Sequence, residues 1–130
     1  MPKKASRSKL VKTADQIFST YIRRRHAKHN DIVECFTCGK NDHWKKMHCG
    51  HFQSRRFYST RWDETNCQIQ CPKCNIFRGG EQFKFGLYLD KKFGRGTSEK
   101  LLQKASKTIK LSNVDIQEII SYYKDKVSKL

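Results

Sequence analysis

Two Cys-x-x-Cys motifs, Cys35–Cys38 and Cys71–Cys74, constrain the fold of this chain more than any other feature. Each motif presents two sulfur atoms from one tight turn, and Gly39, directly after the first motif, suits such a turn. Four thiolates arranged as a tetrahedron form a closed structural zinc site. A redox pair is the alternative, but neither motif lies in the strand–helix–strand pattern of a thioredoxin-like fold. The sequence therefore predicts one structural Zn²⁺ ion held by all four cysteines.

The composition agrees with a small, metal-stabilised domain. Hydrophobic residues make up 36% of the 130 residues, so the core is small and a bound metal would help the chain to fold. The chain contains no apolar run of about 18 residues, and its basic N-terminus has no apolar segment of the secretory type. We therefore expect a cytoplasmic protein with no membrane partner, in which the remaining cysteines, Cys49 and Cys67, are small buried hydrophobic residues.

The net charge indicates the kind of partner. A formal charge of +16 favours a polyanion, and nucleic acid is a better candidate than an anionic membrane surface. Seven arginines are candidate DNA contacts, because guanidinium groups clamp phosphates. They are Arg23, Arg24, Arg25, Arg55, Arg56, Arg61 and Arg78.

The order of patterns along the chain predicts an α+β fold. Residues 1–12 are expected to be a basic arm, and residues 13–31 a basic helix that begins at a capping box, Thr13 to Gln16. Residues 32–80 are expected to hold short strands at 32–34, 44–52 and 67–71, a loop at 54–65, and a helix from Cys74 to the glycines at 79 and 80. Residues 81–130 are predicted to be helical, with a capping box from Ser112 to Asp115. The apolar stripe at 116–130 is either core or the contact surface of a homodimer.

A histidine and two asparagines accompany the cysteine motifs. His51 and Asn66 lie between the motifs, and Asn75 follows the second one directly. The stretch GHFQSRRFYSTRWDETNCQIQCPKCNIFRGG, residues 50–80, resembles the HNH, or ββα-metal, endonucleases. With the flanking motif at Cys35 it resembles phage endonuclease VII, and through its GHF, D-E-x-N and CxxCN-x3-GG runs the NinG/Rap recombination endonuclease family of lambda-type phages. The resemblance covers roughly residues 13–95.

The resemblance implies both a fold and an activity. The fold would be a zinc-bound ββα-metal core flanked by N-terminal and C-terminal helices. The activity would be metal-dependent cleavage of branched recombination intermediates, such as Holliday junctions and forks, in the cytoplasm of the host cell if a phage encodes the chain. His51 would be the general base, Asn66 would hold that histidine in orientation, and Asn75 would bind the catalytic Mg²⁺ or Mn²⁺.

One position departs from the usual HNH pattern. Gly50 stands directly before His51, where a metal-binding aspartate is common, so another ligand must assist Asn75. His48 is the first candidate, although strand alternation would place His48 and His51 on opposite faces unless Gly50 forms a bulge. Asp63 and Glu64 are the alternatives with oxygen ligands. If His48 is a ligand, we expect Mn²⁺ to serve at least as well as Mg²⁺, because imidazole is a softer ligand than carboxylate.

Other interpretations remain open. Aromatic residues at Phe57, Tyr58 and Trp62 either stack on unpaired bases or fill a small core. The missing aspartate would also suit a zinc-ribbon protein that binds nucleic acid without cleaving it. A sequence-specific homing or restriction nuclease of HNH type is a further alternative, although the short chain offers no separate domain for reading sequence.

Overall fold

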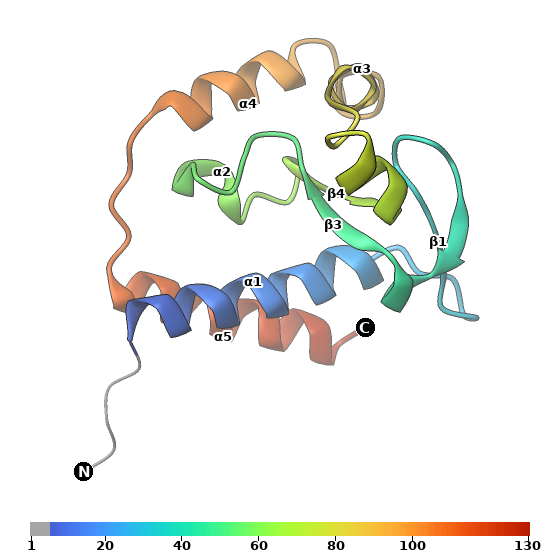
Figure 1. Ribbon diagram of the computed structural model, residues 1–130. Coiled ribbons are helices and arrows are strands. Elements are labelled where there is room, and N and C mark those ends of the chain that lie inside the picture. The colour runs from blue at the N-terminus through green and yellow to red at the C-terminus, as the bar shows by residue number, and fades with distance from the viewer. Residues whose placement is uncertain (1–5) are drawn as a thin grey trace.

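The computed structural model describes residues 6–130, which form a mixed α+β arrangement of helices and two small antiparallel sheets. The helices are α1 Arg7–Arg24, α2 Tyr58–Arg61, α3 Gln82–Phe93, α4 Thr97–Ser106 and α5 Asn113–Ser128. The strands are β1 Ile32–Glu34, β2 Asn41–His43, β3 His48–His51 and β4 Cys67–Gln70, and the short turns are the 3₁₀ helix η1 Trp44–Lys46 and the π-helix η2 Lys73–Phe77. In Figure 1 the β3–β4 hairpin lies between the α1–α5 pair and the α3–α4 pair.

The first helix begins earlier than predicted. Its cap is Ser6, whose hydroxyl accepts a hydrogen bond from the backbone N–H of Lys9 at 3.3 Å, so the prediction that the helix begins at Thr13 is wrong. The extra turn contributes Leu10 to a buried cluster with residues of α5, and this contact stabilises it. The helix also ends at Arg24, before the predicted end at residue 31. Of the predicted basic arm, residues 1–5 lie outside the part of the chain that the structure describes.

Helices α1 and α5 bury the apolar stripe that the sequence predicts near the C-terminus. Ile116, Ile120 and Tyr123 of α5 are buried, and they pack against residues of α1 such as Ala14 and Phe18. The predicted capping box is confirmed, because Ser112 and Asp115 bond to each other's backbone N–H groups at 3.1 and 2.8 Å. The stripe is therefore mainly core within one chain. A homodimer stays a prediction and would need a different surface.

The central region keeps the predicted strands with one interruption. The stretch predicted as a single strand from Trp44 to Phe52 divides into η1 and the strand β3, and β3 pairs with β4 in a continuous antiparallel register. The expected loop before β4 contains the short helix α2, and the helix expected at Cys74 is the π-helical turn η2. Gly79 and Gly80 follow with φ of 59° and 85°, a backbone conformation that glycine adopts without steric cost.

The core is divided into small clusters rather than one large one. One cluster surrounds the cysteine motifs and includes Val33 and Met47, with Trp44 packed against it. Another joins Phe85 and Leu89 of α3 to Leu101 of α4. Among the described residues, no helix combines the length and the apolar character that crossing a bilayer requires.

Candidate functional site

The four motif cysteines converge on one point. Their sulfur atoms all lie within 4.8 Å of one another, and the Sγ atoms of Cys38 and Cys71 are 3.6 Å apart. Sulfur atoms on a tetrahedral zinc ion are separated by about 3.8 Å, which follows from a Zn–S bond of about 2.3 Å. The backbone N–H of Cys71 also donates to Cys35 Sγ at 3.2 Å, and that of Cys74 donates to Cys71 Sγ at 3.5 Å. The cluster therefore fits a structural Zn²⁺ ion, as the spacing predicts.

Hydrogen bonds prepare one of these sulfur atoms for the metal. Burial opposes the ionisation of Cys35, but the backbone N–H of Cys71 and the hydroxyl of Thr37 help to outweigh it and lower its pKa to about 6. Burial raises the pKa of Cys74 to about 12. Because only thiolates bind zinc, metal binding must release protons from the cluster, and its affinity will fall as the pH falls.

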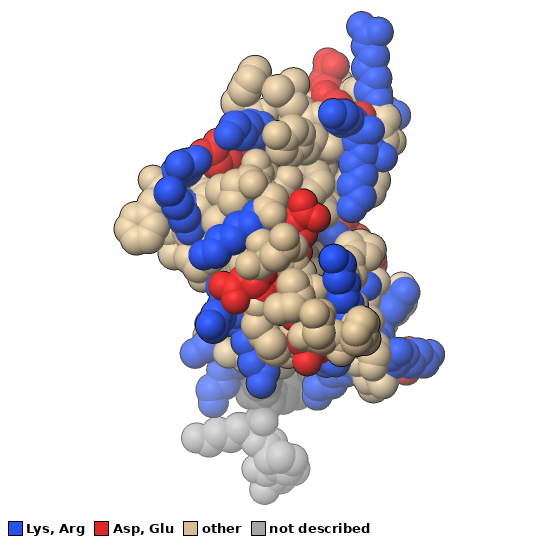
Figure 2. Space-filling model, turned by 90° about the vertical axis from the view of Figure 1, so that its right-hand side faces the viewer, with Lys and Arg blue, Asp and Glu red and all other residues tan. Residues whose placement is uncertain are grey.

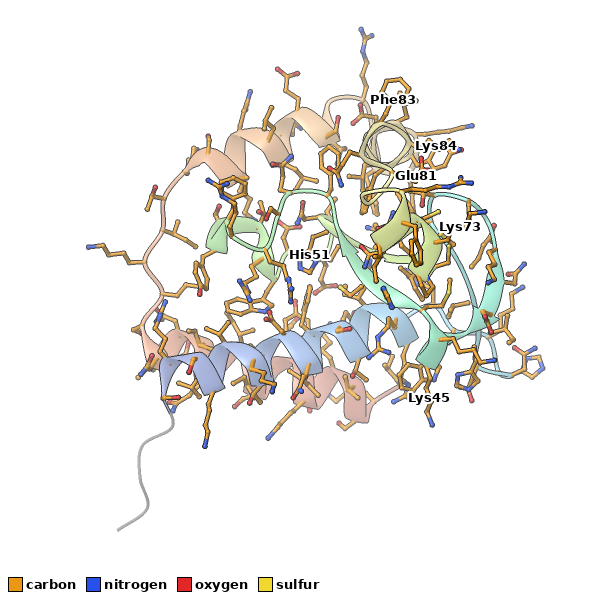
Figure 3. The ribbon with its side chains drawn as sticks, viewed as in Figure 1. Lys45, His51, Lys73, Glu81, Phe83 and Lys84 are labelled. Carbon is orange, nitrogen blue, oxygen red and sulfur yellow. The ribbon has the colours of Figure 1, made fainter. Side chains whose placement is uncertain are left out.

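A pocket of about 580 Å³ brings together two of the predicted catalytic residues, His51 and Asn75, but not Asn66. It lies between α1 and the segment from η2 to α3, and His48, His51 and Asn75 all line it. Figure 3 shows His51 near the centre of the molecule, with Lys45 beside α1 and with Lys73, Phe83 and Lys84 at η2 and the start of α3. The side chains of Arg23, Lys45 and Arg55 also line the pocket, so its walls are basic.

His48 and Asn75 are direct neighbours. The side-chain Nδ2 of Asn75 lies 3.1 Å from Nδ1 of His48. The two ends of an amide are assigned from their surroundings, and rotation of the Asn75 amide by 180° would direct its oxygen at the same point as the imidazole nitrogen. An amide oxygen and an imidazole nitrogen that converge in this way fit a divalent cation such as Mn²⁺. His48 and Asn75 therefore lie side by side in the pocket, and their role as metal ligands stays a prediction.

Gly50 does not form a bulge, so the expected strand alternation holds. The register runs without interruption from His48 opposite Gln70 to His51 opposite Cys67, so His48 and His51 do point to opposite faces. Both still reach the pocket because, within residues 6–130, this sheet has two strands and β3 has no further strand on its other side. Side chains from both faces can therefore line a pocket along this edge.

The surroundings of His51 determine which nitrogen carries the proton. Its Nε2 lies 2.9 Å from the carbonyl oxygen of Arg61, and a carbonyl oxygen can only accept a hydrogen bond. Nε2 therefore holds the proton, and Nδ1 is left with its lone pair. Burial lowers the pKa of His51, the carbonyl of Arg61 opposes this shift, and the charge of Arg55 adds to it. The imidazole is consequently neutral near pH 7 and has one basic nitrogen.

Asn66 holds the loop that supplies this carbonyl. Its side chain is completely buried. Its Oδ1 accepts a hydrogen bond from the backbone N–H of Gln53 at 2.7 Å, and its Nδ2 donates to the carbonyls of Gln53 at 3.1 Å and Thr60 at 3.0 Å. The residue thus connects the two ends of the loop between His51 and Arg61. The role of Asn66 in orienting the histidine stays a prediction, which would act through this loop.

The two acidic candidates for metal binding lie elsewhere. Asp63 accepts hydrogen bonds from the backbone N–H groups of Thr65 and Asn66 at 2.8 and 3.0 Å, and its other oxygen pairs with Lys104 at 2.5 Å. Glu64 accepts a hydrogen bond from the hydroxyl of Tyr123 at 3.0 Å. Neither lines the pocket. The structure therefore does not bring Asp63 or Glu64 to His48, because both carboxylates hold loops and helices in place.

Gly50 is explained by a residue that the sequence patterns did not single out. A Cβ atom at position 50 would lie 2.0 Å from Oε1 of Gln70. The side chain of Gln70 is fully buried, and its Nε2 donates to the hydroxyl of Thr37 at 3.1 Å and to the carbonyl of Gly80 at 2.8 Å. Gln70 therefore links β4 to the first cysteine motif and to the border of the pocket. An aspartate at position 50 does not fit while Gln70 occupies this place.

Two of the predicted DNA contacts are internal instead. The Arg25 side chain is 10% exposed and donates to the carbonyls of Glu64 at 3.0 Å and Cys67 at 2.9 Å. The Arg61 side chain is 14% exposed and forms two hydrogen bonds, of 3.0 and 2.6 Å, with the carboxylate of Asp15. Because these guanidinium groups already have partners inside the molecule, the structure does not favour either residue as a DNA contact.

The other arginines remain accessible. Arg23 and Arg55 line the pocket. Arg24 lies over the ring of Trp44, whereas Arg56 and Arg78 are exposed. Among the aromatic candidates, Trp62 donates its indole N–H to Asp15 at 3.0 Å and packs against residues of α5, which confirms its interpretation as core. Asp15 is a partner that no sequence pattern indicated, since it reaches Trp62 from a distant helix.

A comparison with models of protein families identifies one family to which the chain is similar. The family model described as bacteriophage lambda NinG protein matches residues 2–130. No match was found among curated proteins or among solved structures. The family match extends beyond residues 13–95, where the motifs lie, and includes the C-terminal helices. This chain therefore belongs to the bacteriophage lambda NinG protein family.

Proposed function

We propose that this protein is an HNH-type endonuclease that hydrolyses phosphodiester bonds in branched DNA with the help of a divalent metal ion. The observation that carries the proposal is the convergence of His51 with the His48–Asn75 pair in one basic pocket. His51 offers a basic nitrogen, and the pair offers two metal ligands. Together they are the parts that hydrolysis of a phosphodiester needs.

His51 performs the proton transfer in this mechanism. Its Nδ1 takes a proton from a water molecule while Nε2–H remains bonded to the Arg61 carbonyl, so the ring keeps its orientation as it becomes charged. The oxygen of that water then attacks the phosphorus, and the bond to the leaving oxygen breaks. A divalent cation held by His48 and Asn75 would stabilise the negative charge on the phosphate and leaving oxygen.

The basic walls of the pocket would hold the substrate. Arg23, Lys45 and Arg55 surround the place where the phosphate would lie. Figure 2 shows Lys and Arg side chains distributed over one face of the molecule, with fewer Asp and Glu among them. Contacts of this type bind the sugar–phosphate backbone and carry no sequence information. The arrangement therefore favours selection of DNA by shape over selection by sequence.

Exposed aromatic rings beside the pocket support a branched substrate. Phe77 is 81% exposed and Phe83 is 80% exposed, and both flank the segment from Gly79 to Gln82 that borders the pocket. Lysines and an arginine lie close to them in the chain; these are Lys73, Arg78 and Lys84. Bases at a branch point expose faces that duplex DNA hides, and stacking on an aromatic ring is worth about 1–3 kcal/mol per base.

We expect the Phe83→Ala substitution to weaken the preference for branched DNA by roughly tenfold, which is the effect of losing one stacked base. The phenyl group is exposed, so its removal should leave the melting temperature unchanged. The measurement is the ratio of cleavage rates on a four-way junction and on linear duplex. Phe93→Ala is the matched control, since Phe93 lies at the opposite end of α3 and is 45% exposed. An unchanged ratio in Phe83→Ala would exclude this role.

We expect the His48→Asp substitution to shift the metal preference from Mn²⁺ toward Mg²⁺. A carboxylate oxygen is a harder ligand than imidazole, and it adds a negative charge to a pair of neutral ligands. The measurement is the ratio of cleavage rates with the two ions, at equal concentrations, for wild type and variant. His43→Asp serves as a control, because His43 lies in β2 and does not line the pocket. The same ratio in wild type and His48→Asp would show that His48 does not hold the metal.

The nuclease proposal is tested with a panel of DNA shapes. The panel contains four-way junctions, forks, nicked duplex and linear duplex, each incubated with Mg²⁺ or Mn²⁺. We expect cleavage of the branched forms and little cleavage of linear duplex. Binding without cleavage of any substrate would instead support a non-catalytic zinc protein. One observation favours the non-catalytic protein. The carboxylate of Asp15 lines the pocket, but it is already paired with Arg61 instead of being free to bind a metal ion.

A further inference from the structure

We propose that Cys49, His51 and Cys67 form a second binding site for a soft metal ion such as Zn²⁺, separate from the site of the four motif cysteines. One ligand atom from each residue lies within 4.8 Å of the others. Cys49 and His51 are two positions apart on β3, so they point to the same face, and Cys67 is directly opposite His51 on β4. The pairing of the two strands therefore assembles the group.

The ligand set determines which ions the site would accept. Two thiolates and an imidazole favour Zn²⁺ and similar soft ions over Mg²⁺, which prefers oxygen. Three protein ligands leave one position of a tetrahedron for water. Cys49 and His51 line the pocket, which gives the ion a path from solvent, whereas Cys67 is fully buried behind them. The site would be open on the pocket side and closed on the side of the core.

Binding involves a defined proton balance. Burial raises the pKa of Cys67 well above its usual value, so this thiol remains protonated without a metal. When Zn²⁺ binds, Cys49 and Cys67 each lose a proton to solvent, and the two thiolates neutralise the charge of the ion. The imidazole donates a lone pair and loses no net proton. Occupancy should therefore decrease as the pH falls.

An ion at this site would compete with catalysis. His51 belongs both to the group and to the catalytic pocket, and its imidazole cannot bind the ion and also remove a proton from water. Zinc above one equivalent should therefore inhibit cleavage. This consequence rests on the proposed nuclease function, whereas binding of the ion does not.

The test is a metal titration of the full chain. Co²⁺ replaces Zn²⁺ as a spectroscopic probe, and sulfur-to-cobalt absorption in the near ultraviolet counts the thiolate sites. We expect two equivalents per wild-type chain and one equivalent in Cys49→Ala and in His51→Gln, which keep the four motif cysteines. One equivalent in the wild type, or a second equivalent that survives both substitutions, would overturn the site.

A second measurement tests inhibition. Cleavage of a four-way junction is followed with and without one extra equivalent of Zn²⁺, and the ratio of the two rates is compared between wild type and Cys49→Ala. We expect at least a tenfold loss in the wild type and a clearly smaller loss in the variant. Equal losses would overturn the inhibitory role. If the wild type cuts no DNA at all, the nuclease proposal fails, and the Co²⁺ titration still decides whether the site exists.

Discussion

Replacing Cys71 with serine will release the structural zinc and unfold the centre of the molecule. Structural Zn²⁺ contributes about 10–16 kcal/mol in small zinc-binding peptides, and a domain of ordinary stability has only about 5–15 kcal/mol in total. Cys71 is almost completely buried, and its backbone N–H donates to Cys35 Sγ, so the change affects both cysteine motifs. The measurements are zinc content per chain and thermal unfolding followed by circular dichroism.

Tryptophan fluorescence adds local detail to this experiment. Trp44 packs against the cysteine cluster, whereas Trp62 packs against residues of α1 and α5. We expect the emission of Trp44 to change on loss of zinc in a variant that lacks Trp62. Cys49→Ala is the control, because it removes a cysteine that does not belong to the motifs and should keep the structural zinc. A Cys71→Ser protein with the melting temperature of the wild type would contradict the predicted role of the metal.

Replacing His51 with alanine should reduce the rate of DNA cleavage by a factor of about 10²–10⁴, the usual contribution of a general base. Binding of DNA should change little, since the basic residues of the pocket remain. The cleavage rate of the wild type should also depend on pH, and it should decline on the acidic side. Because burial lowers the pKa of His51, the neutral form persists below pH 6.5, and the rate should decline only as the pH falls through that lowered pKa.

The control for this variant is His29→Ala, since His29 is exposed and lies outside the pocket. Cleavage rates and DNA affinity are measured for both variants under the same metal concentration. Comparison of their melting temperatures separates catalysis from folding. If His51→Ala cleaves DNA at the rate of the wild type, His51 is not the base and the proposed mechanism is wrong.

Patterns that depend on nearby residues were predictable from the sequence. The cysteine spacing predicts the cluster, because each pair is held within one turn, and the capping box at Ser112 predicts the start of α5. The beginning of α1 was not predictable in this way. Its first turn depends on contacts of Leu10 with a helix more than a hundred residues later, and a local pattern contains no information on such a contact.

Sequence patterns also could not predict the partners of charged residues. Arg25 and Arg61 resemble the other basic residues in the sequence, but carbonyl groups and Asp15 enclose them in the fold. Whether an arginine faces solvent or an internal acceptor depends on the packing of distant elements. Gly50 is an intermediate case. A glycine within a strand often marks either a bulge or a close approach, and only the pairing of β3 with β4 identifies Gln70 as the close neighbour here.

The contact between Gly50 and Gln70 limits which side chains these two positions can hold at the same time. A variant with an acidic residue at position 50 also needs a shorter side chain at position 70, because both cannot occupy the same volume. That shorter side chain would lose the hydrogen bonds to Thr37 and Gly80. Two packings therefore exclude each other in this fold: an acidic residue at position 50 with a small side chain at position 70, or glycine at position 50 with glutamine at position 70. A single substitution does not connect them.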